Sequence, residues 1–288
     1  PPAARATTAA PSDDRAPIAV REDLPEVGDS QFATGVTRVE PTAAPATDMG
    51  ARIAPRADAA RRTAGRAAAA EGTYTCSGFG TVDDDTSSEE VTRDVFEWGG
   101  FPAYQVGDGA GNVNWRVNPY QNPSWYMWLH SLRWLGQGII EASAGDVALL
   151  DRVGATLRDW IRDNPYSWKG DIGAWESTMH RTNVLICYRQ AVLNAHGTTT
   201  LPAQYAWVDA SLRDHATFLI ENWSGAWNHG TDESLALFGV GCLLSRADYR
   251  DLAVDRLQQG ITTSIDSQGS TNEQSTAYAD FNYNLWGR

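Results

Sequence analysis

Three short polar motifs in this sequence carry residue types that can move a proton or hold an anion. The first is Asn228-His229, which stands just before Thr231-Asp232-Glu233. Because Thr231 or Asp232 can cap a helix and the acids favour its positive end, we expect Asn228 and His229 to precede the cap and point into a cleft. There an amide can donate hydrogen bonds to an anion, and an imidazole can serve as a base. The alternative is a turn histidine bonded to a backbone carbonyl.

The other two motifs are a Glu-Gln-Ser-x-x-Tyr run and a Glu–His–Arg cluster. Tyr278 follows a glycine loop at the start of an expected helix, where its phenol can donate a proton, although a tyrosine there is more often a packing residue. Glu176 and His180 are four residues apart, on one face of an expected helix, with Arg181 beside them. A surface ion pair explains this cluster equally well. None of the three motifs identifies a reaction by itself.

The elements that must position these residues are helices. Apolar side chains repeat at spacings of three and four from Trp98 almost to the end of the chain, with no clear strand alternation and no glycine-rich phosphate loop. Short connections between such helices favour antiparallel hairpins, so the sequence predicts an all-α fold. The expected helices span about 123–139, 146–164, 176–196, 202–223, 231–245 and 248–265, with a seventh beginning near Ser275.

Composition divides the chain into three parts. Residues 1–72 are rich in Ala, Pro, Arg and Asp and contain no Trp, Tyr or Cys. A segment so poor in large apolar side chains cannot bury enough surface to offset its chain entropy, so we expect a disordered leader. We expect an irregular linker over 73–97 and the helical domain over 98–288.

Charge, hydropathy and cysteine content exclude several classes of protein. The net charge of −13 argues against nucleic acid as a partner, and no apolar run approaches the roughly 18 residues of a membrane span. Three cysteines are too few and too scattered for a disulfide scaffold or a structural zinc site. Because Cys187 and Cys242 lie in apolar helical stretches, we expect both to be buried and reduced, with Cys76 the readily alkylated thiol.

Together, the motifs resemble the N-terminal helical domain of the heparinase II/III-like polysaccharide lyases, which include alginate and oligoalginate lyases. The resemblance covers about residues 100–286. The matching residues are Asn228-His229, Glu273-Gln274-Ser275-x-x-Tyr278 fifty residues later, Trp115–Pro119, Trp125, His130–Trp134, Asp159-Trp160-Ile161 before Asn164-Pro165, Trp175 and Arg181.

The resemblance implies a fold and a function. The fold is an incomplete (α/α) toroid of antiparallel helical hairpins, followed in the family by a β-sandwich that supplies a second catalytic residue and often a structural metal. The function is cleavage of uronic-acid polysaccharides by β-elimination. Because the chain ends at Arg288, we expect a partial toroid with no cofactor or metal of its own and little activity alone. The expected partner is an acidic polysaccharide, and the expected location is secreted, periplasmic or at the cell surface, although no signal peptide is visible.

The resemblance also assigns roles to individual residues. Elimination requires donors that neutralise the uronate carboxylate, and the resemblance gives this task to Asn228 and His229, with His229 also a candidate base. Tyr278 becomes the acid that protonates the departing glycosidic oxygen, or acid and base together. Because Ala279 stands where the family motif has a histidine, Tyr283 is the second candidate for the acid.

Further contacts to the substrate follow from the same resemblance. Arg181 is expected to bind a neighbouring carboxylate, and Trp125, Trp175 and Trp227 are expected to offer stacking faces for sugar rings. Two alternatives come from other classes of protein. One is a non-catalytic carbohydrate-binding or scaffold protein. The other is an α/α-fold glycoside hydrolase, which needs two carboxylates about 5 to 10 Å apart, chosen from Asp171, Glu176, Asp232, Glu233 and Glu273.

Overall fold

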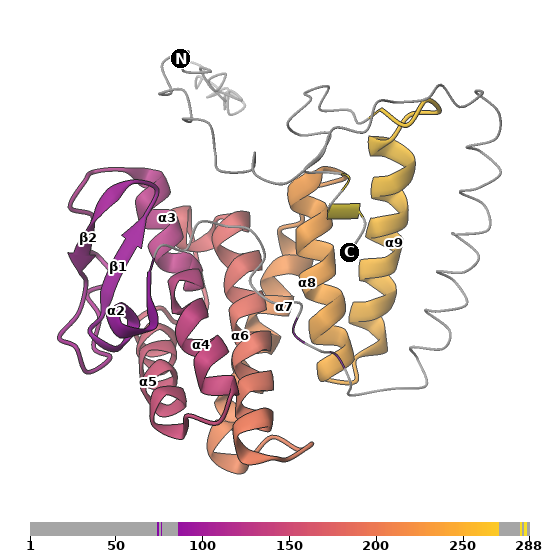
Figure 1. The fold of residues 1–288 in the computed structure, drawn as a ribbon. Coiled ribbons are helices and arrows are strands. Elements are labelled where there is room, and N and C mark those ends of the chain that lie inside the picture. The colour runs from indigo at the N-terminus through magenta and orange to yellow at the C-terminus, as the bar shows by residue number, and fades with distance from the viewer. Residues whose placement is uncertain (1–73, 75, 77–85, 271–282, 284, 287–288) are drawn as a thin grey trace, which may run out of the picture. The chain divides into compact units, whose positions relative to one another are not determined.

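In the computed structural model, residues 74, 76, 86–270, 283, 285 and 286 are described. Helices pack in antiparallel pairs that follow one another along the chain, with a small β-hairpin near their start (Figure 1). The predicted all-α class is therefore confirmed. The elements are α2 (Ser88–Thr92), β1 (Val95–Trp98), β2 (Phe101–Gln105), α3 (Pro123–Ser131), η1 (Arg133–Leu135), α4 (Gly136–Ser143), α5 (Val147–Asp163), η2 (Gly170–Gly173), α6 (Trp175–His196), η3 (Ala203–Tyr205), α7 (Ala206–Glu221), α8 (Asn228–Leu243) and α9 (Ala247–Ser264).

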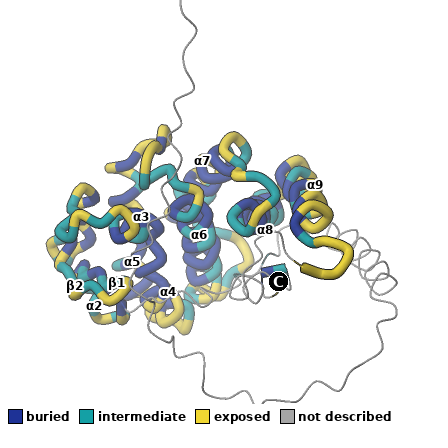
Figure 2. The backbone as a smooth tube through the Cα atoms, turned by 90° about the horizontal axis from the view of Figure 1, so that it is seen from above, coloured by how far each residue is buried: buried dark blue, intermediate teal, exposed yellow. Residues whose placement is uncertain are grey.

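Helix α6 is the centre of the packing. It contacts α3, α4, α5, α7 and α8, and 13 of its 22 residues are buried. A helix with neighbours on so many sides needs apolar residues around most of its circumference. Figure 2 shows most of α6 in the colour of buried residues. The direction of α6 is thus determined by its neighbours, which also determine where its first residues, Trp175 and Glu176, lie.

Local sequence signals explain several helix ends. Asn122 and Asp146 cap α3 and α5 through side-chain oxygens that accept from the backbone N–H groups of Trp125 and Leu149, both at 2.9 Å. Helix α5 ends just before Asn164-Pro165, since the residue before proline avoids the α region. These predicted boundaries are confirmed.

The helix expected over 123–139 is divided. Helix α3 ends at Ser131, Leu132 adopts a left-handed conformation with φ 58°, and the chain continues as η1 and α4. A left-handed residue costs about 1–2 kcal/mol, whereas burying a leucine side chain contributes about 1.5–3 kcal/mol. Because Leu132 and Trp134 are both buried, tertiary packing outweighs the continuous helical periodicity here.

The hairpin of β1 and β2 differs from the expectation that the domain lacks strands. Val95 lies opposite Gln105 in an antiparallel register with one bulge. Gly99 and Gly100 join the strands with φ of 65° and 73°, the positive values that a two-residue hairpin turn requires. The Gly-Gly pair between aromatic residues was the available signal, but strands of four and five residues are too short to alternate clearly.

Regular structure also begins before the domain boundary expected at residue 98. Helix α2 and strand β1 lie in the stretch predicted to be an irregular linker. The helix is explained by a capping box, in which Ser87 and Glu90 bond reciprocally to each other's backbone N–H groups. The predicted disordered leader, residues 1–72, lies outside the described residues.

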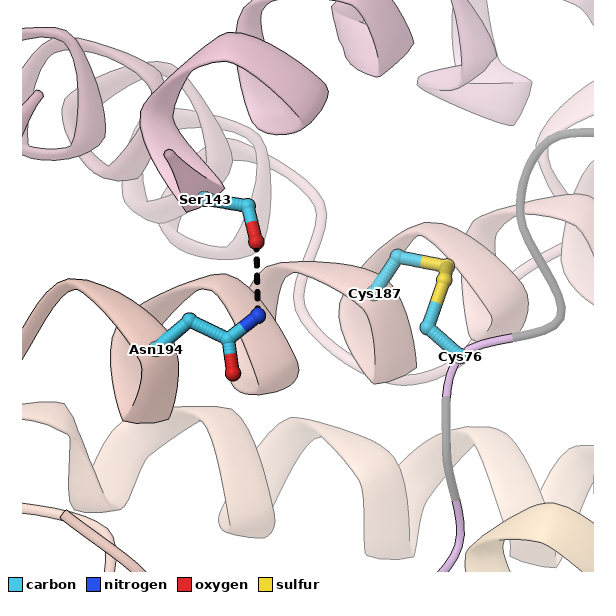
Figure 3. Close-up of a disulfide and its surroundings, with 4 residues drawn as sticks. All are labelled: Cys76, Ser143, Cys187 and Asn194. Atoms are coloured by element: carbon cyan, nitrogen blue, oxygen red, sulfur yellow. Dashed lines mark hydrogen bonds between the residues drawn. A yellow bond between two sulfur atoms is a disulfide. The ribbon is translucent and has the colours of Figure 1, made fainter. Parts of the chain in front are cut away.

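Cys76 and Cys187 form a disulfide that links positions 111 residues apart (Figure 3). This corrects the expectation of a reduced Cys187 and a reactive Cys76. Neither cysteine is near the other in sequence, and only the packing of the chain beside α6 brings their Cα atoms to 4.8 Å. Among the described residues, Cys242 is the free cysteine, as expected, but it is only partly buried and not buried as predicted.

Contacts near the disulfide tie three helices together. Tyr74 lies against Gly239 of α8, where an added β-carbon would meet the tyrosine ring at 2.8 Å. Further along α6, Asn194 Nδ2 donates to Ser143 Oγ of α4 at 2.8 Å (Figure 3). Cys76 is therefore attached to α6, and Tyr74 is packed on α8.

Candidate active site

Helix α8 begins at Asn228, earlier than the sequence predicts. Asn228 and His229 therefore occupy its first turn and do not precede a cap at Thr231 or Asp232. The N-cap position is Trp227, which makes no side-chain cap bond, and Thr231 Oγ1 donates to the carbonyl oxygen of Trp227 at 3.0 Å. The predicted cap is wrong because the preceding loop approaches the helix more closely than the sequence indicates.

That loop, residues 222–227, is pinned to α8 and α9. A β-carbon on Gly230 would lie 1.7 Å from the carbonyl oxygen of Gly225, so only glycine permits the approach. Trp223 Nε1 donates to the carbonyl oxygen of Gly230 at 3.1 Å. From α9, Ser264 Oγ donates to the carbonyl oxygen of Ala226. The chain thus has a defined path into the first turn of α8.

Glu233 of α8 binds the loop 222–227 through hydrogen bonds made in the protein interior. Its side chain is fully buried, and its carboxylate accepts from Ser224 N–H at 2.9 Å and from Ser224 Oγ at 2.7 Å. Burial raises the pKa of Glu233 to about 7, although the bonds from Ser224 and the charge of Arg256 oppose the rise. Arg256 also donates to the carbonyl oxygens of Leu219 and Ile220, at the end of α7. Glu233 is therefore an internal anchor of the loop.

His229 contacts the first turn of α6. Its Nε2 lies 3.6 Å from Glu176 Oε1, and both side chains are partly exposed. Trp175 meets the imidazole edge to face, with ring centroids 5.3 Å apart. Burial lowers the pKa of His229 and raises the pKa of Glu176. Because α6 and α8 both begin here, two helix N-termini present their positive ends at one rim.

The remaining residues of this rim are polar or aromatic. Asn228 Oδ1 accepts from the backbone N–H of His229 at 2.8 Å, so the oxygen of the amide is occupied. Trp175 and Trp227 are 46% and 50% exposed, high values for so large an apolar side chain. We call Trp175, Glu176, Trp227, Asn228 and His229 the α6–α8 rim. The structure thus brings together four of the residues expected at the site and adds Glu176.

Glu176 was predicted to share a helix face with His180. The structure gives the two residues different neighbours. The His180 ring stacks on Trp128 with centroids 4.9 Å apart, and its Nδ1 lies 3.4 Å from Arg133 Nη1. Spacing along one helix could not reveal the contact with His229, because that partner lies on another helix.

Arg181 does not reach the rim. Its guanidinium is fully buried and lies over the rings of Trp160 and Trp168, at 4.0 and 4.7 Å. The expected contact with a substrate carboxylate is therefore wrong, because all three nitrogen atoms of the guanidinium donate inside the fold. The acceptors are His215 Nε2, the carbonyl oxygens of His130 and Ile172, Ser177 Oγ and Thr178 Oγ1, at 2.7 to 3.3 Å.

Trp125 is also a core residue and not a stacking face for sugar. It is fully buried, with Phe96 at 4.9 Å and Tyr120 at 5.6 Å between ring centroids. Its position in α3, two residues after the first helical residue, points it toward the hairpin. The spacing of three and four that predicted the helix also predicted a buried face, and Trp125 belongs to that face.

Tyr278 and Tyr283 are the two candidates for the acid. Tyr278 lies outside the described residues, as does Glu273. Tyr283 is described and is 78% exposed. The expected convergence of Tyr278 with Asn228 and His229 stays a prediction.

Within the described ranges, no group of three or more His, Cys, Asp or Glu side chains is arranged to hold a metal ion. The expectation that this chain has no metal of its own stays a prediction. None of the helices in the same ranges combines the length and apolar character that crossing a bilayer requires.

Solved structures with a similar fold include a heparinase III and a heparan sulfate lyase. A heparinase III with methylated lysines matches with a TM-score of 0.59 and 16% identity, over 71% of this chain and 35% of that one. A heparan sulfate lyase, HepC from Pedobacter heparinus, matches with a TM-score of 0.56 and 16% identity, over 77% and 39%. A mutant of HepC matches with a TM-score of 0.57. The match covers less than two fifths of the length of these proteins, and at this identity it shows the fold alone, a partial (α/α) toroid as predicted.

No curated protein matches the sequence. The sequence itself, however, matches the family model of the heparinase II/III N-terminus over residues 79–283, which is most of the chain. That range contains both helices of the α6–α8 rim and the predicted Tyr278. The chain therefore belongs to the heparinase II/III N-terminus family.

Proposed function

We propose that the α6–α8 rim binds the uronate unit of an acidic polysaccharide and takes part in its cleavage by β-elimination. The observation that carries the proposal is the pairing of an amide and an imidazole in the first turn of α8, with the half-exposed ring of Trp175 against the imidazole and the half-exposed Trp227 preceding the amide. Because the oxygen of Asn228 is bonded to a backbone N–H, its NH₂ group remains to donate to an anion. The helix N-termini favour a carboxylate at the same place.

The chemistry of elimination explains these residue types. Removing the proton α to a uronate carboxylate is difficult unless donors accept the charge that develops on the carboxylate. Asn228 and His229 supply such donors. We assign proton transfer to and from the sugar to Tyr278, on the family motif alone, with Tyr283 as the second candidate.

The charges near the rim favour a substrate without dense sulfation. Arg181 is occupied inside the core, and the sequence has no Lys or Arg over residues 223–240, which contain the loop before α8 and most of that helix. The rim itself contains an acid, Glu176. Multiple sulfates call for several guanidinium or ammonium groups, whereas one carboxylate can be held by an amide, an imidazole and helix ends. We infer an unsulfated polyuronate, of which alginate is an example.

The same observations favour elimination over hydrolysis. A hydrolase needs two carboxyl groups facing one sugar. Of the candidates, Glu233 is buried and bonded to Ser224, and Glu176 faces His229. The disulfide between Cys76 and Cys187 supports export to an oxidising compartment, where such bonds persist.

The test is formation of the conjugated unsaturated uronate, followed by its ultraviolet absorbance, on mixing the protein with polyuronates and with heparan sulfate. We expect the absorbance to rise with an unsulfated polyuronate and to be lost in Asn228→Ala and His229→Ala. His196→Asn, at the far end of α6, is the matched control and should retain activity. Reducing sugar without absorbance would indicate a hydrolase, and binding without either product would indicate a carbohydrate-binding protein.

The acid has a separate test. Tyr278→Phe removes only the phenolic proton, so we expect elimination to be abolished while binding of the polysaccharide is largely retained. Calorimetric titration beside the absorbance assay checks both. Full activity of Tyr278→Phe would contradict the assignment and direct attention to Tyr283.

A further inference from the structure

We propose that Glu176 is a positioning residue that keeps His229 able to donate to a substrate carboxylate, an inference that rests on the proposed function. The two side chains come from the first turns of α6 and α8 and meet with Glu176 Oε1 3.6 Å from His229 Nε2. Their helices are far apart in sequence but pack directly on one another. The contact is therefore a product of the fold at the rim where the substrate is proposed to bind.

The geometry distinguishes the two nitrogens of the imidazole. Nε2 faces Glu176, and Trp175 lies against the ring at 5.3 Å between centroids. The ring nitrogen that faces a carboxylate takes the proton, which leaves Nδ1 as the nitrogen that can serve a ligand. At 3.6 Å the two atoms are too far apart for a good hydrogen bond but within the distance of an ion pair.

Charge explains why His229 needs this neighbour. A neutral imidazole has one N–H and cannot donate from both nitrogens, whereas an imidazolium can. Burial lowers the pKa of His229 and raises the pKa of Glu176, so each group alone resists ionisation at this place. Side by side, opposite charges stabilise each other. With Glu176 ionised beside it, His229 is held as the imidazolium, whose Nε2–H faces the Glu176 carboxylate while its Nδ1–H donates to the substrate uronate.

Other titratable or charged groups lie on the elements that carry this pair or pack against it. They are His180 on α6, Arg133 in η1, Asp171 in η2 and Asp232 on α8. Among the described residues, Glu176 is the one whose charged group lies within ion-pair distance of the His229 imidazole. We therefore expect a substitution of Glu176 to change the pKa of His229 more than a substitution of any of these other groups does.

The direct test does not depend on lyase activity. The whole chain is titrated by NMR, and the His229 signals are assigned from their loss in His229→Asn. We expect the pKa of His229 to fall in Glu176→Gln and to remain near the wild-type value in Glu176→Asp and in the control Glu141→Gln, an exposed residue of α4. An unchanged pKa of His229 in Glu176→Gln would overturn the proposal.

The functional test uses the pH profile of elimination. In Glu176→Gln we expect kcat/KM to fall about tenfold at neutral pH, and its alkaline limb to move to lower pH, with partial recovery in Glu176→Asp. A loss that is uniform across pH would indicate a merely structural role and would overturn the proposal. Absence of elimination in the wild type would refute the proposed function instead, and the NMR titration would still decide the role of Glu176.

Discussion

Removing the disulfide between Cys76 and Cys187 should strongly destabilise the toroid. The Cys76–Cys187 bond closes a loop of 111 residues that includes α2 to α5 and half of α6. In the chain-entropy model, restricting an unfolded loop of this length stabilises the fold by about 4.8 kcal/mol at 25 °C. In Cys76→Ser the unfolded chain regains that freedom, and the attachment of Tyr74 to α8 is weakened as well.

The magnitude converts into a measurable temperature. For a domain of this size, each kcal/mol shifts Tm by about 2–4 °C, so Cys76→Ser should lower Tm by about 10–20 °C. Thermal unfolding followed by far-ultraviolet circular dichroism measures the shift. Adding a reductant to the wild type should reproduce the shift, and adding it to Cys76→Ser should change nothing further.

Cys242→Ser is the matched control, because this thiol is only partly buried and makes no disulfide. We expect its Tm to stay within about 3 °C of the wild type, in line with a conservative change of less than about 1 kcal/mol. A thiol titration of the native protein should find one reactive group. Three reactive thiols without denaturant, or a Tm shift in Cys76→Ser no larger than that of the control, would refute the reasoning.

Three further changes probe the loop and the rim. Because burial raises the pKa of Glu233 from 4.5 to about 7, the folded state binds the extra proton between these values, and stability should fall by roughly 3 kcal/mol as pH rises through that window. Glu233→Gln should flatten that slope in urea unfolding at several pH values. Gly230→Ala would force its β-carbon against the Gly225 carbonyl and should cost about 1–3 kcal/mol, measured the same way. Trp227→Ala should weaken oligosaccharide binding about tenfold by calorimetry, with Tm unchanged, since half of the side chain is already exposed; equal affinity would remove Trp227 from the site.

The candidate site was predicted in part from the sequence. Asn228, His229, Trp175 and Trp227 do lie together, because each flanks the start of a helix and α7 runs back between α6 and α8, so that both of these helices begin at the same rim. Arg181 and Trp125 were placed at the site by motif and belong to the core. A motif match does not show which way a side chain points, and an arginine that donates to several carbonyl groups inside the fold is a core residue.

Some features of this structure depend only on neighbours within about one helical turn, and adjacent residues in the sequence are enough to specify them. The caps at Asn122 and Asp146, the end of α5 before Asn164-Pro165 and the turn at Gly99-Gly100 all arise from bonds or dihedral preferences over a few residues. Such interactions involve residues that are close in sequence, so they can form before the rest of the chain folds.

Tertiary structure decided the features whose partners lie far apart in sequence. The break at Leu132, the disulfide at Cys187, the burial of Arg181 and the contact between Glu176 and His229 each depend on which helices pack together. Periodicity shows that a helix has a buried face, but it does not identify the helix on the other side. The free energy of these contacts comes from groups brought together only when α6 is surrounded, so no local pattern could specify them.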